Sequence, residues 1–116
     1  KDMELEVGDS KLFYRDSDQT VVIEGSMRLA NLSEYEVVGD FLKEVSQKAN
    51  DILNIDVSDL QFLNSSGITT FSMFILSCKK QGNPRLKVLG SNDISWQEKL
   101  LRKFKKLWDE VSVEVN

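Results

Sequence analysis

The residues best placed to do chemistry are two hydroxyls in the segment Asn64-Ser65-Ser66-Gly67. A strand-like stretch precedes this segment and apolar residues at helical spacing follow it, which places it where a helix begins. The first N–H groups of a helix lack partners within the helix and, together with the helix dipole, favour an anion. A phosphate on a serine here would meet these donors, and Gly67 would let a partner approach the backbone closely.

A plainer interpretation of the same segment needs no ligand. Asn and Ser are frequent N-cap residues, and Ser-Gly is common in tight loops. Local chemistry alone therefore favours helix capping, with phosphorylation as the alternative.

Enzyme chemistry has little support in the composition. The chain has no histidine, which removes Ser-His and Cys-His nucleophile pairs and every histidine metal motif. Its single cysteine, Cys78, excludes an internal disulfide and a thiolate zinc cluster, and its apolar surroundings predict a small buried side chain rather than a reactive thiol. An enzyme would need Asp56, Ser65 and a lysine to cooperate unaided, so we expect no catalytic residue, no metal site and no cofactor.

Length and charge bound the class of protein. The 116 residues predict one domain, residues 1–116, and 41% apolar and 29% charged residues are typical of a soluble globular protein. The net charge of −4 argues against non-specific nucleic-acid binding. No apolar run approaches the length of a membrane span and no signal peptide is visible, so we expect a cytoplasmic protein without an integral membrane segment.

The first half of the chain predicts strands followed by a helix. Leu5–Val7, Leu12–Tyr14 and Val21–Glu24 are short β-like runs separated by turn residues, which indicates an antiparallel start. A helix is expected from about Ser33 to Asn50, with Ser33 as its N-cap residue. Its apolar face is predicted to comprise Val38, Phe41, Leu42, Val45 and Ala49.

The second half predicts alternating strands and helices. Strands are expected at Ile52–Val57, Leu86–Leu89 and Val111–Val115. The middle helix has Ile68, Phe71, Ile75 and Cys78 on one face, widened by Met73, Phe74 and Leu76, and ends at Gly82-Asn83-Pro84. We expect this helix to be well buried. The apolar stripe of the last helix comprises Trp96, Leu100, Leu101, Phe104, Leu107 and Trp108.

Strands that alternate with helices imply crossover connections in a parallel sheet. The predicted fold is therefore a single α/β domain with a mixed, mostly parallel sheet, an N-terminal antiparallel hairpin and about three packed helices.

One segment resembles the signature of a known family. Ile55-Asp56-Val57, then Leu60-Gln61-Phe62-Leu63, then Asn64-Ser65-Ser66-Gly67 is similar to the STAS family, the sulfate-transporter and anti-sigma-factor-antagonist domains. That family pattern has an apolar strand with Asp, a short loop with an apolar-x-Phe-apolar run, and then Asp-Ser-Ser/Thr-Gly. The order of predicted strands and helices extends the resemblance over nearly the whole chain.

The resemblance implies a bacterial, non-enzymatic partner switch that regulates transcription. In the family's antagonists, a partner that is both serine kinase and anti-sigma factor phosphorylates the serine matching Ser65, which breaks the complex, and a cognate phosphatase would restore it. By that register we expect Ser65 to be the phosphorylation site. The expected partner-binding residues are Asp56, Asn64, Ser65, Ser66, Gly67, Ile68 and Thr69.

Two features depart from the family pattern. Asn64 stands where the family has Asp, so hydrogen-bonding capacity is kept but the charge is lost. Basic residues crowd the polar side of the last helix, which suits a solvated face or, as an alternative, an anionic membrane surface or an acidic partner. These departures favour an alternative function, a non-switching STAS-like interaction subunit of a transporter or lipid-trafficking complex. The basic residues are Lys99, Arg102, Lys103, Lys105 and Lys106.

Overall fold

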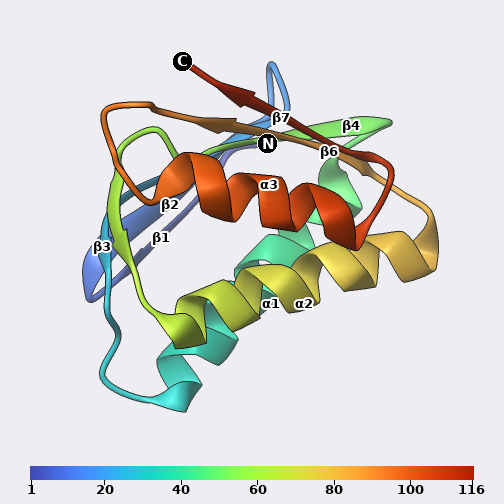
Figure 1. Cartoon of the computed structure of the whole chain (residues 1–116). Coiled ribbons are helices and arrows are strands. Elements are labelled where there is room, and N and C mark those ends of the chain that lie inside the picture. The colour runs from blue at the N-terminus through green and yellow to red at the C-terminus, as the bar shows by residue number, and fades with distance from the viewer.

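The computed structural model describes residues 1–116. It contains seven strands and three helices, which are joined by turns and loops (Figure 1). In chain order they are β1 Met3–Val7, β2 Asp9–Arg15, β3 Thr20–Met27, α1 Leu32–Lys48, β4 Ile52–Asp56, β5 Leu60–Leu63, α2 Ser65–Gln81, β6 Arg85–Gly90, α3 Gln97–Leu107 and β7 Val111–Val115. The predicted α/β domain with three helices is confirmed.

The seven strands form one mixed sheet. Six of them lie side by side in the order β1-β2-β3-β4-β6-β7, and β5 pairs with β3 beyond the end of β4. The β1–β2 and β2–β3 pairs are antiparallel, whereas β3–β4, β4–β6 and β6–β7 are parallel. The predicted antiparallel start is thus confirmed, and it consists of three strands.

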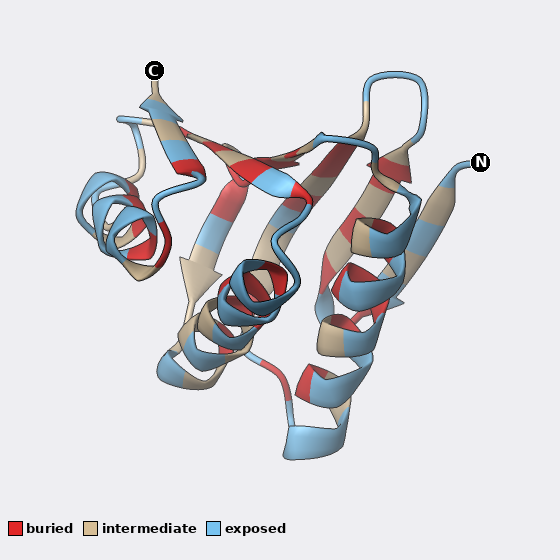
Figure 2. Cartoon of the chain, turned by 90° about the vertical axis from the view of Figure 1, so that its right-hand side faces the viewer, coloured by how far each residue is buried: buried red, intermediate tan, exposed pale blue.

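All three helices cover the same face of the sheet, and α2 lies between α1 and α3 (Figures 1 and 2). The core fills the space between this helix layer and the sheet. Leu42 of α1, Leu53 of β4 and Leu86 of β6 are among its fully buried side chains. The middle position gives α2 two neighbouring helices, so its exposed surface is a narrow ridge between two valleys.

The pairing of β5 with β3 is irregular. Leu60 and Phe62 lie opposite Gly25 and Ser26, so the extra residue of the bulge is Gln61 of β5. Thr20 to Val22 pair with β4, but the ladder with β5 starts at Gly25 and shifts register between Gly25 and Ser26. Gly25 has φ +93, and a Cβ atom there would lie 2.2 Å from the backbone oxygen of Asp9. Only glycine fits this position without strain.

Strand β5 was not predicted from the sequence. Residues 60–63 were expected to be a loop, yet they form a parallel strand on β3. Consequently the strand that leads into α2 is β5 rather than the central strand β4. The start of α2 still lies near the carboxyl end of a parallel pair, because Leu63 is opposite Met27, the last residue of β3.

The predicted N-cap of α1 was wrong by two residues. Asn31 is the N-cap residue, and its side-chain oxygen accepts from the Glu34 N–H at 3.1 Å. Ser33 instead donates its hydroxyl to the Asn31 oxygen. A serine and an asparagine two residues apart compete for the same role, and the chain enters the helix at the earlier one.

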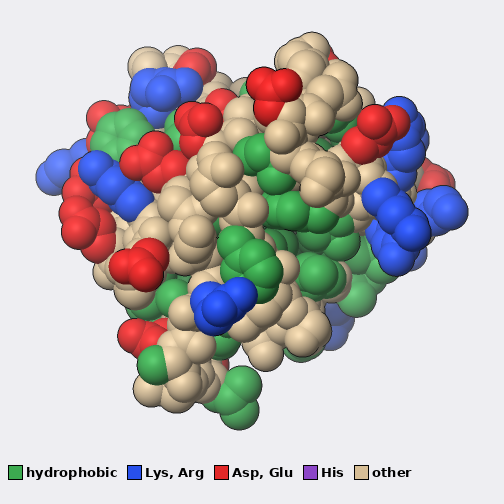
Figure 3. Space-filling model, turned by 60° about the vertical axis from the view of Figure 1, so that its left-hand side comes forward, with side chains coloured by type: hydrophobic (Ala, Val, Ile, Leu, Met, Phe, Trp, Pro, Cys, Tyr) green, Lys and Arg blue, Asp and Glu red, His purple; other side chains and the backbone are tan.

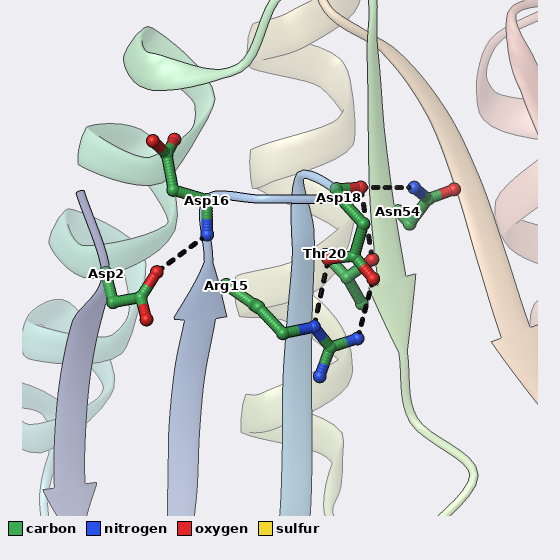
Figure 4. A network of polar contacts seen from close by, with 6 residues as sticks. All are labelled: Asp2, Arg15, Asp16, Asp18, Thr20 and Asn54. Carbon is green, nitrogen blue, oxygen red and sulfur yellow. Dashed lines mark hydrogen bonds and ion pairs between the residues drawn. The ribbon is translucent and has the colours of Figure 1, made fainter.

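Polar contacts fix the β2–β3 turn at the other end of the sheet (Figure 4). The Arg15 guanidinium donates two hydrogen bonds to the Asp18 carboxylate, at 3.0 and 2.9 Å. These bonds are the main reason why the pKa of Asp18 is lowered. The Asp18 carbonyl accepts from Asn54 of β4, which joins the turn to the parallel strands. Asp2 accepts from the Asp16 N–H at 2.8 Å.

Candidate regulatory site at the start of α2

Asn64 caps α2, and the serines that follow do not. The Asn64 side-chain oxygen accepts from the Gly67 N–H at 3.0 Å, while its backbone has extended dihedrals. The Ile68 N–H donates to the Asn64 carbonyl at 2.9 Å. Capping therefore explains Asn64 but leaves both serine hydroxyls unexplained.

The cap is also tied to α1. The Tyr35 hydroxyl donates to the Asn64 side-chain oxygen at 2.6 Å and accepts from the Leu29 N–H at 3.1 Å. Tyr35 and Leu29 are both buried. One phenol thus joins the β3–α1 connection, the first turn of α1 and the start of α2.

We expect Tyr35→Phe to lower the free energy of unfolding by about 1 kcal/mol, because it leaves the buried Leu29 N–H without a partner. Chemical denaturation measures the loss, and amide hydrogen exchange locates it at Leu29 and Gly67. A variant as stable as the wild type, with both amides still protected, would show that the phenol does not link these segments.

The side chains of the predicted site residues on α2 point in three different directions. Ser65 and Thr69 are exposed on the outer surface, Ser66 faces α1, and Gly67 is buried. Ile68 is half-buried and packs against the core. Of the hydroxyls from Ser65 to Thr70, only that of Thr70 is used internally, as a donor to the Ser66 carbonyl at 2.9 Å. Ser65 therefore presents a free, solvent-exposed hydroxyl.

Asp56 lies apart from these residues. Ile55 and Val57, its neighbours in the chain, are buried on the helix-covered face. Because side chains alternate along a strand, Asp56 points to the opposite face of the sheet. There its carboxylate accepts from the Ser58 N–H at 2.9 Å and from the Ser58 hydroxyl. The combination of Asp56, Ser65 and a lysine that an enzyme would need is therefore not assembled.

An arginine that the sequence analysis did not single out lies beside the site. Arg28 follows Met27, the last residue of β3 paired with β5, so it is next to Asn64 across the two strands. Its guanidinium stacks on the Phe62 ring, 4.3 Å from the ring centre, and Arg28 forms no ion pair.

An open groove of about 670 Å³ separates α1 from α2. Hydroxyls form most of its α2 wall, namely those of Ser66, Thr69, Thr70 and Ser77. The α1 wall carries charges of both signs, from Glu36, Asp40 and Lys43. The groove is therefore largely polar.

The valley between α2 and α3 differs, because its base is lined only by hydrophobic side chains. The free space at the base is about 20 Å³, close to what one water molecule needs, so it is a packed core rather than a ligand chamber. Three of the lining residues are only half-buried and therefore lie at the opening of the valley. They are Leu63, Trp96 and Leu100.

The start of α3 is attached to β5 by two side chains. Trp96 donates its indole N–H to the Gln61 carbonyl at 2.9 Å. Gln97 is fully buried and donates to the Val57 and Leu60 carbonyls at 2.6 and 3.0 Å. The strand that leads into Ser65 is thus held between β3 and α3.

The prediction that α2 is well buried was wrong for its outer surface. Met73 is 66% exposed and Leu76 is 45% exposed. The 14 residues from Ser65 to Cys78 carry no charge. Charged residues are depleted at the centres of protein interfaces, and exposed apolar side chains accumulate there. The missing charges were visible in the sequence, but apolar periodicity alone suggested burial.

Cys78 faces the core as predicted. It is 5% exposed, and burial raises the pKa of its thiol to about 11. The thiol is therefore not a nucleophile at neutral pH. None of the three helices has both the length and the apolar character needed to span a bilayer, and no three Cys, Asp or Glu residues cluster as metal ligands do.

Comparisons with known proteins bear on the fold. No family model and no curated protein matches the chain, so the STAS resemblance remains a prediction. The chain is similar to the solved structure of SiaC of Pseudomonas aeruginosa, with a TM-score of 0.73 and 14% identity over 100% of this chain and 99% of that one. Apo-SiaC of the same organism gives a TM-score of 0.74 and 17% identity, covering 100% of this chain and 98% of that one.

A third similar structure contains a complex. It is the diguanylate cyclase SiaD with its activator SiaC, also from Pseudomonas aeruginosa, and one of its chains gives a TM-score of 0.73 and 13% identity. The match covers 98% of this chain and 99% of that one. At these identities the likeness shows a shared fold, and it spans the whole domain.

Proposed function

We propose that this chain is a non-enzymatic regulatory module that binds a partner protein through α2, and that phosphorylation of Ser65 releases the partner. The observation that carries the proposal is the division of roles at the start of α2. Asn64 caps the helix, which leaves the Ser65 hydroxyl exposed and free of internal hydrogen bonds. A hydroxyl in this position is accessible to a kinase.

The surface around Ser65 supports a docking role. Beyond Ser65 the exposed side of α2 carries Thr69, Met73 and Leu76, and it is uncharged as far as Cys78. A phosphate brings a charge of about −2 to such a surface. A partner that buries this ridge would have to desolvate that charge, so the modification weakens binding.

The similar structures suggest what kind of partner is regulated. SiaC is described as the activator of the diguanylate cyclase SiaD, which is a non-enzymatic role on a signalling enzyme. We propose a partner of the same general kind, a signalling enzyme whose activity depends on whether this chain is bound. The kinase and phosphatase that would set the state of Ser65, and an anti-sigma role like that of STAS antagonists, belong to this proposal.

A second candidate follows from Asn64. Without the carboxylate that STAS antagonists have at this position, the chain would be a constitutive interaction subunit, for example of a transporter or lipid-trafficking complex. One measurement distinguishes the two candidates, because the second predicts that partner binding is indifferent to charge at Ser65.

Affinity capture from cells of the source species tests the proposal. The bait is the wild-type chain, run beside Ser65→Asp and Ser65→Ala, and phosphosites are mapped on the recovered bait. We expect phosphate on Ser65 and a partner that is retained by wild type and Ser65→Ala but lost by Ser65→Asp. Phosphate found only on Ser66, Thr69 or Thr70, or equal recovery with all three baits, would contradict the switch.

We expect Asn64→Asp to change the rate of Ser65 phosphorylation more than it changes the fold. The side-chain oxygen that accepts from Gly67 and Tyr35 is present in both residues, so stability should move by only a few tenths of a kcal/mol. Phosphate incorporation by the cognate kinase and a denaturation curve measure the two effects. An unchanged rate together with a large loss of stability would refute this expectation.

A further inference from the structure

The α3 side of α2 carries a basic rim. Lys79 of α2 donates to the Leu107 carbonyl of α3 at 3.4 Å, so this side of α3 faces α2. Lys103 lies three residues after Leu100 and four before Leu107, and residues at these spacings share one strip of a helix. Lys103 therefore borders the valley beside the half-buried Leu100, and Lys99 is exposed one turn before Lys103 on α3.

These lysines have no acidic partner. The only ion pair made by α3 joins Arg102 to Glu98 at 3.0 Å. Lys105 donates to the Val111 carbonyl of β7, on the other side of the helix. Lys99, Lys103 and Lys79 thus present unpaired positive charge beside the valley, although the chain as a whole has a net charge of −4.

Apolar side chains occupy the space between these charges. Ile68 of α2 lies three turns before Lys79 and is half-buried, as is Leu100 of α3. Leu76 is an exposed apolar residue one turn before Lys79. Leu63 and Trp96 line the same space near the starts of α2 and α3. Figure 3, which brings the starts of α2 and α3 forward, shows a hollowed hydrophobic area with Lys and Arg side chains along one side. Hereafter the α2–α3 face means Ile68, Leu76, Lys79, Lys99, Leu100 and Lys103.

We propose that the α2–α3 face docks an acidic amphipathic helix of the partner protein. The apolar side of that helix would pack on Ile68, Leu76 and Leu100, and its Asp or Glu residues would pair with Lys79, Lys99 and Lys103. A hollowed face suits a convex row of helix side chains, whereas a bilayer surface is met by protruding apolar side chains. The proposal rests on the proposed function, since it specifies the partner's chemistry.

The acidic character of the partner also explains the direction of the switch. Ser65 lies one turn before Ile68 and Thr69 on α2, at the end of the valley. A negative charge there lies within a Debye length of a docked acidic helix, so it opposes docking at physiological salt. A basic helix would instead be attracted by the phosphate, and release would not follow.

A display selection tests this chemistry without knowledge of the partner. Random 16-residue peptides are displayed on phage and selected on the immobilised wild-type chain, and the best synthetic peptide is titrated by fluorescence polarisation. We expect acidic sequences with apolar residues at helical spacing. The double variant Lys99→Glu/Lys103→Glu should weaken binding at least tenfold, and a peptide with its acids changed to lysine should regain affinity for that variant.

A matched control keeps the net charge change equal. Lys11→Glu/Lys48→Glu alters β2 and the end of α1 by the same amount and should leave peptide affinity within twofold. Selection of basic peptides, failure to enrich any peptide, or affinity that survives the Lys99/Lys103 reversal would overturn the proposal. Lysine-dependent sedimentation with phosphatidylglycerol vesicles, without preference for acidic peptides, would assign the face to membranes instead.

The same peptide allows the α2–α3 docking face and the phosphorylation switch at Ser65 to be tested separately. If Lys99→Glu/Lys103→Glu abolishes binding while Ser65→Asp does not weaken it, the docking face stands and the gate at Ser65 fails. If Ser65→Asp releases the captured partner but lysine reversal has no effect on the partner or the peptide, the gate stands and the acidic helix is wrong.

Discussion

Ser65→Asp is expected to weaken binding of the captured partner roughly 30-fold, which corresponds to about 2 kcal/mol. Aspartate places one negative charge where the wild-type chain has an exposed hydroxyl on an uncharged ridge. Docking would bury that charge without a compensating partner, and the dissociation rate should carry most of the change. Surface plasmon resonance with immobilised partner measures both rates.

Two variants isolate the effect of charge at this position. Ser65→Ala removes the hydroxyl and adds no charge, so it should bind within a factor of about two of wild type. Ser17→Asp adds the same charge in the exposed β2–β3 turn, at the opposite end of β3, and should also bind normally. If Ser65→Asp keeps its fold by circular dichroism and binds as tightly as wild type, the non-switching function gains support.

Gly25→Ala is expected to lower the free energy of unfolding by about 3 kcal/mol or more. The new methyl group would occupy a position 2.2 Å from the Asp9 backbone oxygen, and φ at this residue is +93. The obstructing atom is main chain in a paired strand, so no side chain can rotate away to relieve the clash. Urea denaturation followed by tryptophan fluorescence measures the loss.

Gly82→Ala is the matched control for this substitution. Gly82 ends α2 with φ +80, but no atom lies within 4 Å of the position of an added Cβ. Its alanine variant bears the backbone strain alone, about 1 kcal/mol. Equal losses in the two variants would mean that the close approach of Asp9 does not constrain β3, and that position 25 could accept other residues.

The predictable part of the fold is the part governed by periodicity. Alternating and helical apolar patterns located six of the seven strands and all three helices, because these elements bury one regular face. Strand β5 was missed, because four residues are too few to display a period and because its ladder with β3 is interrupted by a register shift. Nothing in the local sequence of residues 60–63 indicates that they pair with β3, which lies far away in the chain.

The candidate site was predictable in position but not in the roles of its residues. The turn and helix-start chemistry of residues 64–67 identified the location. Which residue caps was decided by geometry, since the Tyr35 hydroxyl and the Gly67 N–H both converge on the Asn64 oxygen. Tyr35 lies 29 positions earlier in the chain and gives no local signal. The position of Asp56 on the far face depended on its exact place in β4.

The attachment of β5 to α3 has a further consequence for how the protein resists aggregation. Strand β5 pairs with β3 alone, and a strand with only one neighbour invites addition of a strand from another molecule. Side chains reduce that opportunity here, because Trp96 and Gln97 occupy the Gln61 and Leu60 carbonyls. The two occupied carbonyls thereby make β5 a poorer backbone template for an extended chain, beside the site where we propose that a partner binds.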